Sequence, residues 1–205
     1  MRNKIIILCA LSIILALLGV YYFTRPNIVT NYPSKGTDII ALGDSLVEGL
    51  GSTSGNDFVS LLSQKIAEPI VNLGRAGDTT ADVLLRINEL DNYNPRVVIL
   101  LVGGNDYLKK IPIHDTRRNL ATIIENIQAR GAVILLLGVR GGLFNDRFGA
   151  EFENLRDMYH TAFVPDVLDG LFGNPQYMSD TIHPNNVGYQ MIADRIYPVI
   201  AGVLK

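Results

Sequence analysis

Three side chains have the types and surroundings that nucleophilic catalysis requires. Ser45 lies in the segment Gly43-Asp44-Ser45-Leu46, directly after an apolar run. Asp180 and His183 lie three residues apart near the far end of the chain, and Pro184 follows them. A serine hydroxyl is a poor nucleophile until a base removes its proton, and the base works best when a third group holds it. The chain therefore contains the components of such a system, and its elements must bring them together.

Two further segments between these residues carry polar groups next to glycines. They are Gly77-Asp78-Thr79-Thr80 and Gly103-Gly104-Asn105-Asp106. Taken singly, each of the four segments is a weak signal. Alone, the serine segment is explained by a strand-to-helix turn and Gly-Asp-Thr-Thr by a turn with a helix N-cap. Gly-Gly-Asn-Asp alone is an ordinary loop, and the Asp-x-x-His-Pro segment alone is a capped surface turn.

Short apolar runs alternate with longer amphipathic stretches from residue 37 onward. The runs predict strands at residues 38–43, 69–73, 96–102, 132–139 and 161–167. The stretches between them predict helices at residues 56–67, 79–90, 115–130, 147–159 and 186–200. Nearly continuous apolar strands that alternate with helices are typical of a parallel sheet covered on both faces. The expected fold class is therefore α/β, a three-layer α/β/α sandwich with a central parallel sheet of about five strands.

The polar candidates follow the predicted strands. Ser45 comes after the first strand, Gly77 after the second and Asn105 after the third. Ligands of open parallel sheets bind at the carboxyl ends of the strands. We therefore expect these residues to meet at one edge of the sheet.

Taken together and in this order, the four segments resemble the conserved blocks of the SGNH subgroup of the GDSL esterase and lipase family. The resemblance extends over residues 38–200 and is closest to small bacterial envelope enzymes described as acyl-CoA thioesterase I, lysophospholipase and arylesterase. It implies the flavodoxin-like SGNH hydrolase fold and an enzyme without a cofactor. The serine segment is not Gly-x-Ser-x-Gly, because residue 47 is Val, which argues against the α/β-hydrolase scaffold.

The resemblance also implies roles for individual residues. Ser45 would be the nucleophile, His183 the general base and then the acid for the leaving group, and Asp180 the group that holds the His183 ring. The oxyanion hole would combine the backbone N–H groups of Ser45 and Gly77 with the side-chain amide of Asn105. Gly77 would allow a close approach that a Cβ obstructs. Asn105 offers a neutral donor that keeps its protons at any relevant pH.

Substrate contacts are predicted at two places. Arg75 would reach an anionic group of the substrate, or it is simply solvated. The stretch 138–149 follows the fourth strand, and its Leu143, Phe144 and Phe148 would be exposed and contact an acyl chain. Ordinary packing of a loop explains these apolar side chains equally well.

Composition argues against several other classes of protein. The 18 Lys and Arg residues nearly balance the 20 Asp and Glu residues, and no basic stripe is present, so we expect no nucleic-acid partner. The single cysteine and three histidines provide no familiar metal-binding motif, so no metal is expected.

The first 36 residues differ from the rest. Arg2 and Lys4 precede an apolar run at residues 5–23, and residues 24–36 are rich in Pro and Asn, as linkers are. We expect an N-terminal hydrophobic helix that acts as an uncleaved membrane anchor, followed by a catalytic domain at residues 37–205. The domain would face the periplasm or exterior from the inner membrane of the cell envelope. The alternatives are a cleaved signal peptide, which gives a secreted protein, and a buried core helix.

These observations predict a serine hydrolase of carboxylic esters, and of thioesters as a further possibility. Its substrates would be small or medium acyl compounds such as aryl esters or lysophospholipids. A carbohydrate acetylesterase on the same scaffold is the nearest alternative. A membrane-tethered binding module without catalysis is an alternative from another class.

Overall fold

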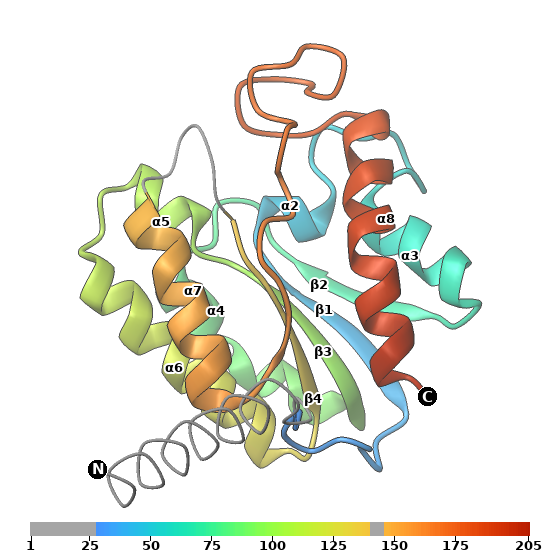
Figure 1. Cartoon of the computed structure of the whole chain (residues 1–205), viewed down its shortest axis with the longest axis vertical. Helices are drawn as coiled ribbons and strands as arrows, with labels where there is room; N and C mark the ends of the chain where they lie inside the picture. Colours follow the sequence, from blue (N-terminus) through green and yellow to red (C-terminus); the bar gives the residue numbers. More distant parts are fainter. Residues whose placement is uncertain (1–27, 140–145) are drawn as a thin grey trace, which may run out of the picture.

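The computed structural model describes residues 28–139 and 146–205. Five parallel strands form a central sheet in the order β2-β1-β3-β4-β5 (Figure 1). Their bounds are β1 Asp38–Gly43, β2 Ile70–Gly74, β3 Pro95–Leu101, β4 Val133–Leu137 and β5 Ala162–Val164. In register, Ile40 of β1 lies between Val71 of β2 and Val98 of β3. The predicted α/β/α sandwich with five parallel strands is confirmed.

Helices cover both faces of the sheet, which explains why the strands are apolar throughout. The helices are α2 Ser45–Glu48, α3 Phe58–Ile66, α4 Thr80–Leu85, α5 Gly104–Leu108, α6 Ile113–Ala129, α7 Asp146–Tyr159 and α8 Asn186–Val203, with a 3₁₀ helix at Ile87–Asn92. Alternate residues of β1 face opposite ways. Ile39 packs in a core with α3 and α8, whereas Ile40 packs in a second core with α4, α6 and α7. Burial on both faces is what a parallel sheet requires.

Three local features differ from the sequence prediction. The helix expected at residues 79–90 ends at Leu85, and a 3₁₀ helix begins at Ile87, so that Arg86 lies at the break. The four-residue α2 and five-residue α5 were not predicted, because such short helices show no apolar periodicity. Phe148 is not an exposed loop side chain. It belongs to α7 and is 6% exposed in the core with α4 and α6.

The predicted N-terminal helix at residues 5–23 lies outside the described residues, as do Leu143 and Phe144. In the part of the chain that the structure describes, no helix has both the length and the apolar character to cross a membrane. The end of the predicted linker contacts the body of the domain. Thr30 donates to the carbonyl of Tyr159 at 2.9 Å, and Asn31 donates to the carbonyl of Gln128 at 2.8 Å.

Candidate active site

Ser45 is held at the carboxyl end of β1 by a tight turn into α2. Asp44 caps this helix, since its carboxylate accepts the N–H of Leu46 at 3.0 Å. Gly43 has no room for a side chain, because a Cβ there would lie 1.9 Å from the carbonyl oxygen of Leu101. With Asp44 as the N-cap, Ser45 is the first residue of α2. Only 8% of its surface is exposed.

His183 and Asp180 reach Ser45 from the loop before α8. The Nε2 atom of His183 lies 3.1 Å from the Oγ of Ser45, and its Nδ1 lies 2.8 Å from the carboxylate of Asp180. The other carboxylate oxygen of Asp180 accepts the N–H groups of Ile182 and His183, both at 2.7 Å. Both oxygens of Asp180 are thus used in aiming the imidazole ring at the serine.

The charge of Asp180 suits this arrangement. Burial raises the pKa of Asp180, but the hydrogen bonds from the His183 ring and from the N–H groups of His183 and Ile182 outweigh it and lower the pKa to about 2. An ionised carboxylate accepts a proton-bearing Nδ1, which leaves Nε2 free to accept the hydroxyl proton of Ser45.

Gly77 and Asn105 lie on two segments that are bonded to each other. Asn105, in α5, donates its side-chain amide to the carbonyl of Asp78 at 2.9 Å. Lys109 donates to the carbonyl of Gly77, also at 2.9 Å. Gly77 has a φ of +85°, and a Cβ there would meet nothing within 4 Å. Within the protein, glycine is therefore required by the left-handed backbone and not by a close contact.

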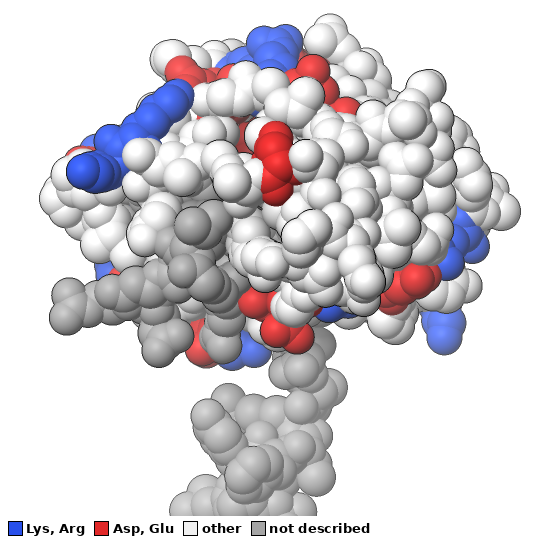
Figure 2. All heavy atoms as spheres, turned by 90° about the horizontal axis from the view of Figure 1, so that it is seen from above, with Lys and Arg blue, Asp and Glu red and all other residues white. Residues whose placement is uncertain are grey.

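A mainly apolar pocket adjoins Ser45. It is lined by Asp44, Ser45, Leu46, Gly104, Asn105, Leu108, Val139, Leu168, Phe172 and Ile182. Figure 2 looks onto the end of the molecule where α2 and the loop before α8 lie, and most of that face is uncharged. The Lys and Arg side chains visible there lie toward its rim. This surrounding suits an uncharged acyl group better than a polyanion.

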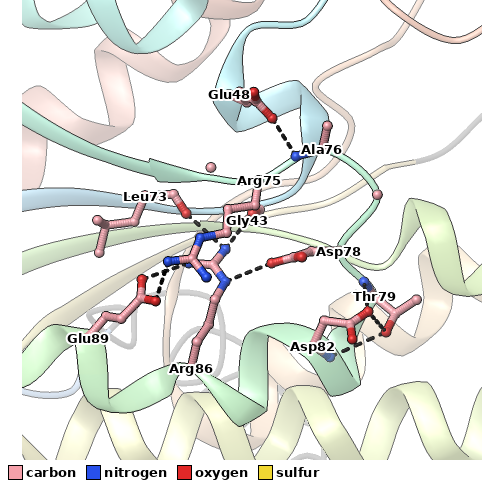
Figure 3. Close-up of polar contacts among 12 residues, drawn as sticks. Gly43, Glu48, Leu73, Arg75, Ala76, Asp78, Thr79, Asp82, Arg86 and Glu89 are labelled. Carbon is pink, nitrogen blue, oxygen red and sulfur yellow. Dashed lines mark hydrogen bonds and ion pairs between the residues drawn. The ribbon is translucent and has the colours of Figure 1, made fainter.

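Of the predicted substrate contacts, Arg75 and Phe148 lie among the described residues, and neither lines this pocket. The guanidinium of Arg75 pairs with the carboxylate of Glu89 and does not line the pocket beside Ser45 (Figure 3). Its role in substrate binding stays a prediction, and so do the roles of Leu143 and Phe144, which lie outside the described residues.

Sequence reasoning missed Arg86, whose side chain is only 8% exposed. The signal that could have revealed it is its position. Val83, Ile87 and Leu90 form the buried stripe of this segment, and a charge three residues after Val83 must lie near that stripe. A buried arginine needs partners, and Figure 3 shows them.

Comparisons with known proteins place this chain in a family. Residues 41–191 match the family described as GDSL-like Lipase/Acylhydrolase. Esterase TesA of Pseudomonas aeruginosa is 29% identical over 178 residues, which are 81% of this chain and 89% of that protein. Thioesterase 1/protease 1/lysophospholipase L1 of Escherichia coli is 30% identical over 165 residues, which are 76% of this chain and 79% of that protein.

Solved structures show the same fold. A crystal structure of TesA matches with a TM-score of 0.77 and 28% identity, and the match covers 82% of this chain and 99% of that one. AlinE4, described as an SGNH-hydrolase family esterase, matches with a TM-score of 0.65 and 30% identity over 83% of this chain and 98% of that one.

Proposed function

Because this chain belongs to the GDSL-like lipase/acylhydrolase family, we propose that Ser45, His183 and Asp180 form the catalytic triad of a serine esterase. Membership of the family makes the chain an enzyme that hydrolyses ester or thioester bonds. The observation that carries the proposed triad is the unbroken chain of contacts from Asp180 through His183 to Ser45, at 2.8 and 3.1 Å.

In the acylation step, His183 Nε2 takes the hydroxyl proton of Ser45 while Oγ attacks the carbonyl carbon of the substrate. The carbonyl oxygen becomes an oxyanion in the tetrahedral intermediate. The imidazolium then gives its proton to the leaving alcohol or thiol, and an acyl group stays on Oγ. Water, deprotonated by His183, attacks this acyl group, releases the carboxylic acid and restores the Ser45 hydroxyl.

The negative charge that develops on the substrate oxygen requires donors. We assign this role to the backbone N–H groups of Ser45 and Gly77 and to the side-chain amide of Asn105. Support for Asn105 comes from its position in the lining of the pocket that contains Ser45. One amide hydrogen of Asn105 bonds to Asp78, and an amide has a second hydrogen to offer.

The substrate that we propose is an ester with a small or medium acyl group, such as an aryl ester or a lysophospholipid. The apolar side chains of Leu108, Val139, Leu168, Phe172 and Ile182 in the pocket support an acyl chain. They favour it over the acetylated carbohydrate of the alternative proposal, which needs an open polar cleft. Relatives named esterase, arylesterase and thioesterase/lysophospholipase support the same choice.

We also propose that residues 1–36 direct the catalytic domain of residues 37–205 out of the cytoplasm, as a membrane anchor or as a cleaved signal. The support is the apolar run at residues 5–23 behind Arg2 and Lys4. N-terminal sequencing of the protein from membrane and soluble fractions distinguishes the two forms. A full-length protein confined to the cytoplasm would contradict both.

The triad is tested by Ser45→Ala, with Ser63→Ala as its control. Ser63 also donates a hydrogen bond, to the carbonyl of Glu68 at 2.7 Å, but on α3 away from the pocket. Turnover of p-nitrophenyl acetate should fall by roughly 10⁴-fold or more in Ser45→Ala, since no nucleophile remains. Ser63→Ala should keep the wild-type rate. Wild-type turnover by folded Ser45→Ala would refute the assignment.

A further inference from the structure

Arg86 lies under the carboxyl ends of two strands. Its guanidinium donates to the carbonyl oxygens of Gly43, the last residue of β1, and of Leu73 in β2, both at 2.9 Å (Figure 3). Its Nε donates to the carboxylate of Asp78 at 2.7 Å, and another nitrogen donates to Glu89 at 3.2 Å. One buried cation thus bridges β1, β2 and the turn that follows β2.

Two of these bonds, to Gly43 and to Asp78, lead toward donors of the proposed oxyanion hole. Gly43 precedes Ser45 by two residues, and Asp78 directly follows Gly77. The backbone carbonyl of Asp78 in turn accepts the side-chain amide of Asn105 at 2.9 Å. Asp78 therefore links the arginine by its carboxylate and the asparagine by its carbonyl.

The turn that carries Gly77 is also bonded to the helix that carries Ser45. Glu48, the last residue of α2, accepts the backbone N–H of Ala76 (Figure 3). This second connection fixes one side of the turn, whereas Arg86 fixes the other side through Asp78. Lys109 and Asn105 hold the same turn through the carbonyls of Gly77 and Asp78, both at 2.9 Å, whereas Arg86 is the residue that ties it to the ends of β1 and β2.

We propose that Arg86 is a positioning residue for catalysis, which holds the donors of the oxyanion hole at the spacing that the transition state requires. This inference rests on the proposed function. Preorganised donors are effective because they need not reorganise when charge develops, and small displacements are costly. Arg86 does not line the pocket beside Ser45, so it would act only through Gly43, Asp78 and the groups that they position.

The chemistry of arginine explains why no other cation suits this position. The planar guanidinium presents five N–H donors in fixed directions, so that it can serve two carbonyls and a carboxylate at once. A lysine ammonium is a compact point charge on a flexible stem and cannot reproduce this geometry. Arg86→Lys should therefore keep the charge but release the turn.

The competing interpretation is that Arg86 contributes only to stability. Arg130 is a matched control, since it donates to the carboxylate of Asp91 at 2.9 Å and to the carbonyl of Asn126 at 2.8 Å. It lies at the end of α6, before β4 begins, and hence at the opposite edge of the sheet from Ser45. Its loss should reduce stability without touching the site.

The experiment compares four variants, namely Arg86→Lys, Arg86→Met, Arg130→Lys and Arg130→Met. Each rate is divided by the concentration of active sites, which is measured by titration with a phosphonate. For p-nitrophenyl acetate, both Arg86 variants should lose roughly 10- to 100-fold in kcat, with KM nearly unchanged. The tetrahedral adduct of an aryl boronic acid puts an oxygen in the oxyanion hole. The affinity of both Arg86 variants for this inhibitor should therefore fall by a similar factor. The Arg130 variants should keep the wild-type kcat and boronate affinity.

A double mutant shows whether Arg86 acts through the donors. Asn105→Ala alone should cost roughly 100- to 1000-fold in kcat. If Arg86 works by positioning that donor and its neighbours, Arg86→Lys should cost clearly less in the Asn105→Ala background than in the wild type. The inference would be overturned if Arg86→Lys lowered kcat by the same factor in both backgrounds. It would also be overturned by a wild-type kcat in both Arg86 variants.

Two controls keep this result interpretable. If Arg86→Met does not fold, Arg86→Lys and Asp78→Asn carry the test, because Asp78→Asn weakens the pair but keeps the carbonyl that Asn105 needs. Failure of the proposed function would appear separately, as wild-type turnover by Ser45→Ala. An inactive Ser45→Ala together with fully active Arg86 variants would reject the positioning role alone.

Discussion

Two carboxyl groups beside Ser45 lie in opposite environments. Asp44, at the edge of the sheet, is 3% exposed, and burial raises its pKa to about 7, although the hydrogen bond from Leu46 opposes this shift. The side chain of Asp180, in the loop before α8, is 54% exposed. Burial raises its pKa, but the hydrogen bonds from the His183 ring and from the N–H groups of His183 and Ile182 together outweigh burial and lower the pKa to about 2.

The contrast separates two tasks. A carboxyl that stays ionised and exposed can stabilise the imidazolium that His183 becomes during the reaction. The buried Asp44 carboxyl instead caps α2, where its oxygen accepts the N–H of Leu46. Environments that push two pKa values apart are a guide to the roles of acidic groups at an active site.

The regions around these two groups are also built differently. The Ser45 side consists of strand ends, short helices and the buried Arg86, so the sheet sets its geometry. The His183 side is a loop that is bonded mostly to itself, for example by Ser179 N–H to the carbonyl of His183 at 2.8 Å. We therefore expect substitutions on the first side to disturb the oxyanion donors and those on the second to disturb the base.

The largest effect is expected for Asp180→Asn. An asparagine cannot hold the tautomer of His183 that leaves Nε2 free, so kcat for p-nitrophenyl acetate should fall by roughly 10⁴-fold. Asp169→Asn, an exposed carboxylate in the same region, is the control and should leave kcat unchanged. Less than a tenfold loss in Asp180→Asn would mean that the carboxylate does not orient the base.

A smaller effect is expected where the two regions touch. A Cβ at Gly51 would lie 2.3 Å from Ser179 Oγ and 2.6 Å from the carbonyl oxygen of Pro184, so Gly51→Ala should displace the loop that carries His183. We expect a roughly 10- to 100-fold lower kcat.

Gly55→Ala is the matched control for this substitution. Gly51 and Gly55 have similar positive φ values, +97° and +78°, but a Cβ at Gly55 meets nothing within 4 Å. Comparing kcat of the two variants should therefore separate the effect of strain in a left-handed backbone from the effect of the contact with the loop that carries His183. Equal losses of kcat would contradict the placement of the loop against Gly51.

The last prediction concerns stability and not activity, namely the pH dependence of unfolding that Asp44 causes. In the folded protein its carboxyl stays protonated up to about pH 7, whereas the ordinary value is 3.8. Unfolding therefore releases a proton between these two values. The free energy of unfolding contributed by this group falls by at most roughly 1.4 kcal/mol for each pH unit from about 4 to about 7, and then levels off.

Asp44→Asn removes this dependence while keeping an oxygen for the cap. Urea unfolding at several pH values between 5 and 8 should show the wild type losing stability relative to Asp44→Asn as the pH rises toward 7. A constant difference between the two proteins would show that Asp44 is ionised throughout.

Much of this arrangement could be predicted from the sequence, for identifiable reasons. β1 was predicted with its observed bounds because its apolar run ends at Gly43. The meeting of Ser45 with residues after β2 and β3 follows from parallel strands sharing one edge. The approach of His183 could be expected only from the order of the four segments, since no local rule places a residue that distant.

The features that escaped prediction depend on tertiary contacts. Arg86 interrupts a helix because its acceptors lie on β1 and β2, which helical periodicity does not record. Phe148 looked like an exposed loop residue, but its ring packs against that of Tyr107 in α5, with ring centroids 6.0 Å apart. The raised pKa of Asp44 depends on burial, which cannot be read from the sequence of the turn alone.

The central claim is that Ser45 is the nucleophile, and covalent labelling tests it most directly. The wild-type protein is treated with a fluorophosphonate, digested, and the modified peptide is identified by mass spectrometry. We predict one phosphonyl group on Ser45, formed quickly in the wild type and much more slowly in Asp180→Asn. A label on another residue, or an unlabelled protein that still hydrolyses esters, would contradict the proposed mechanism.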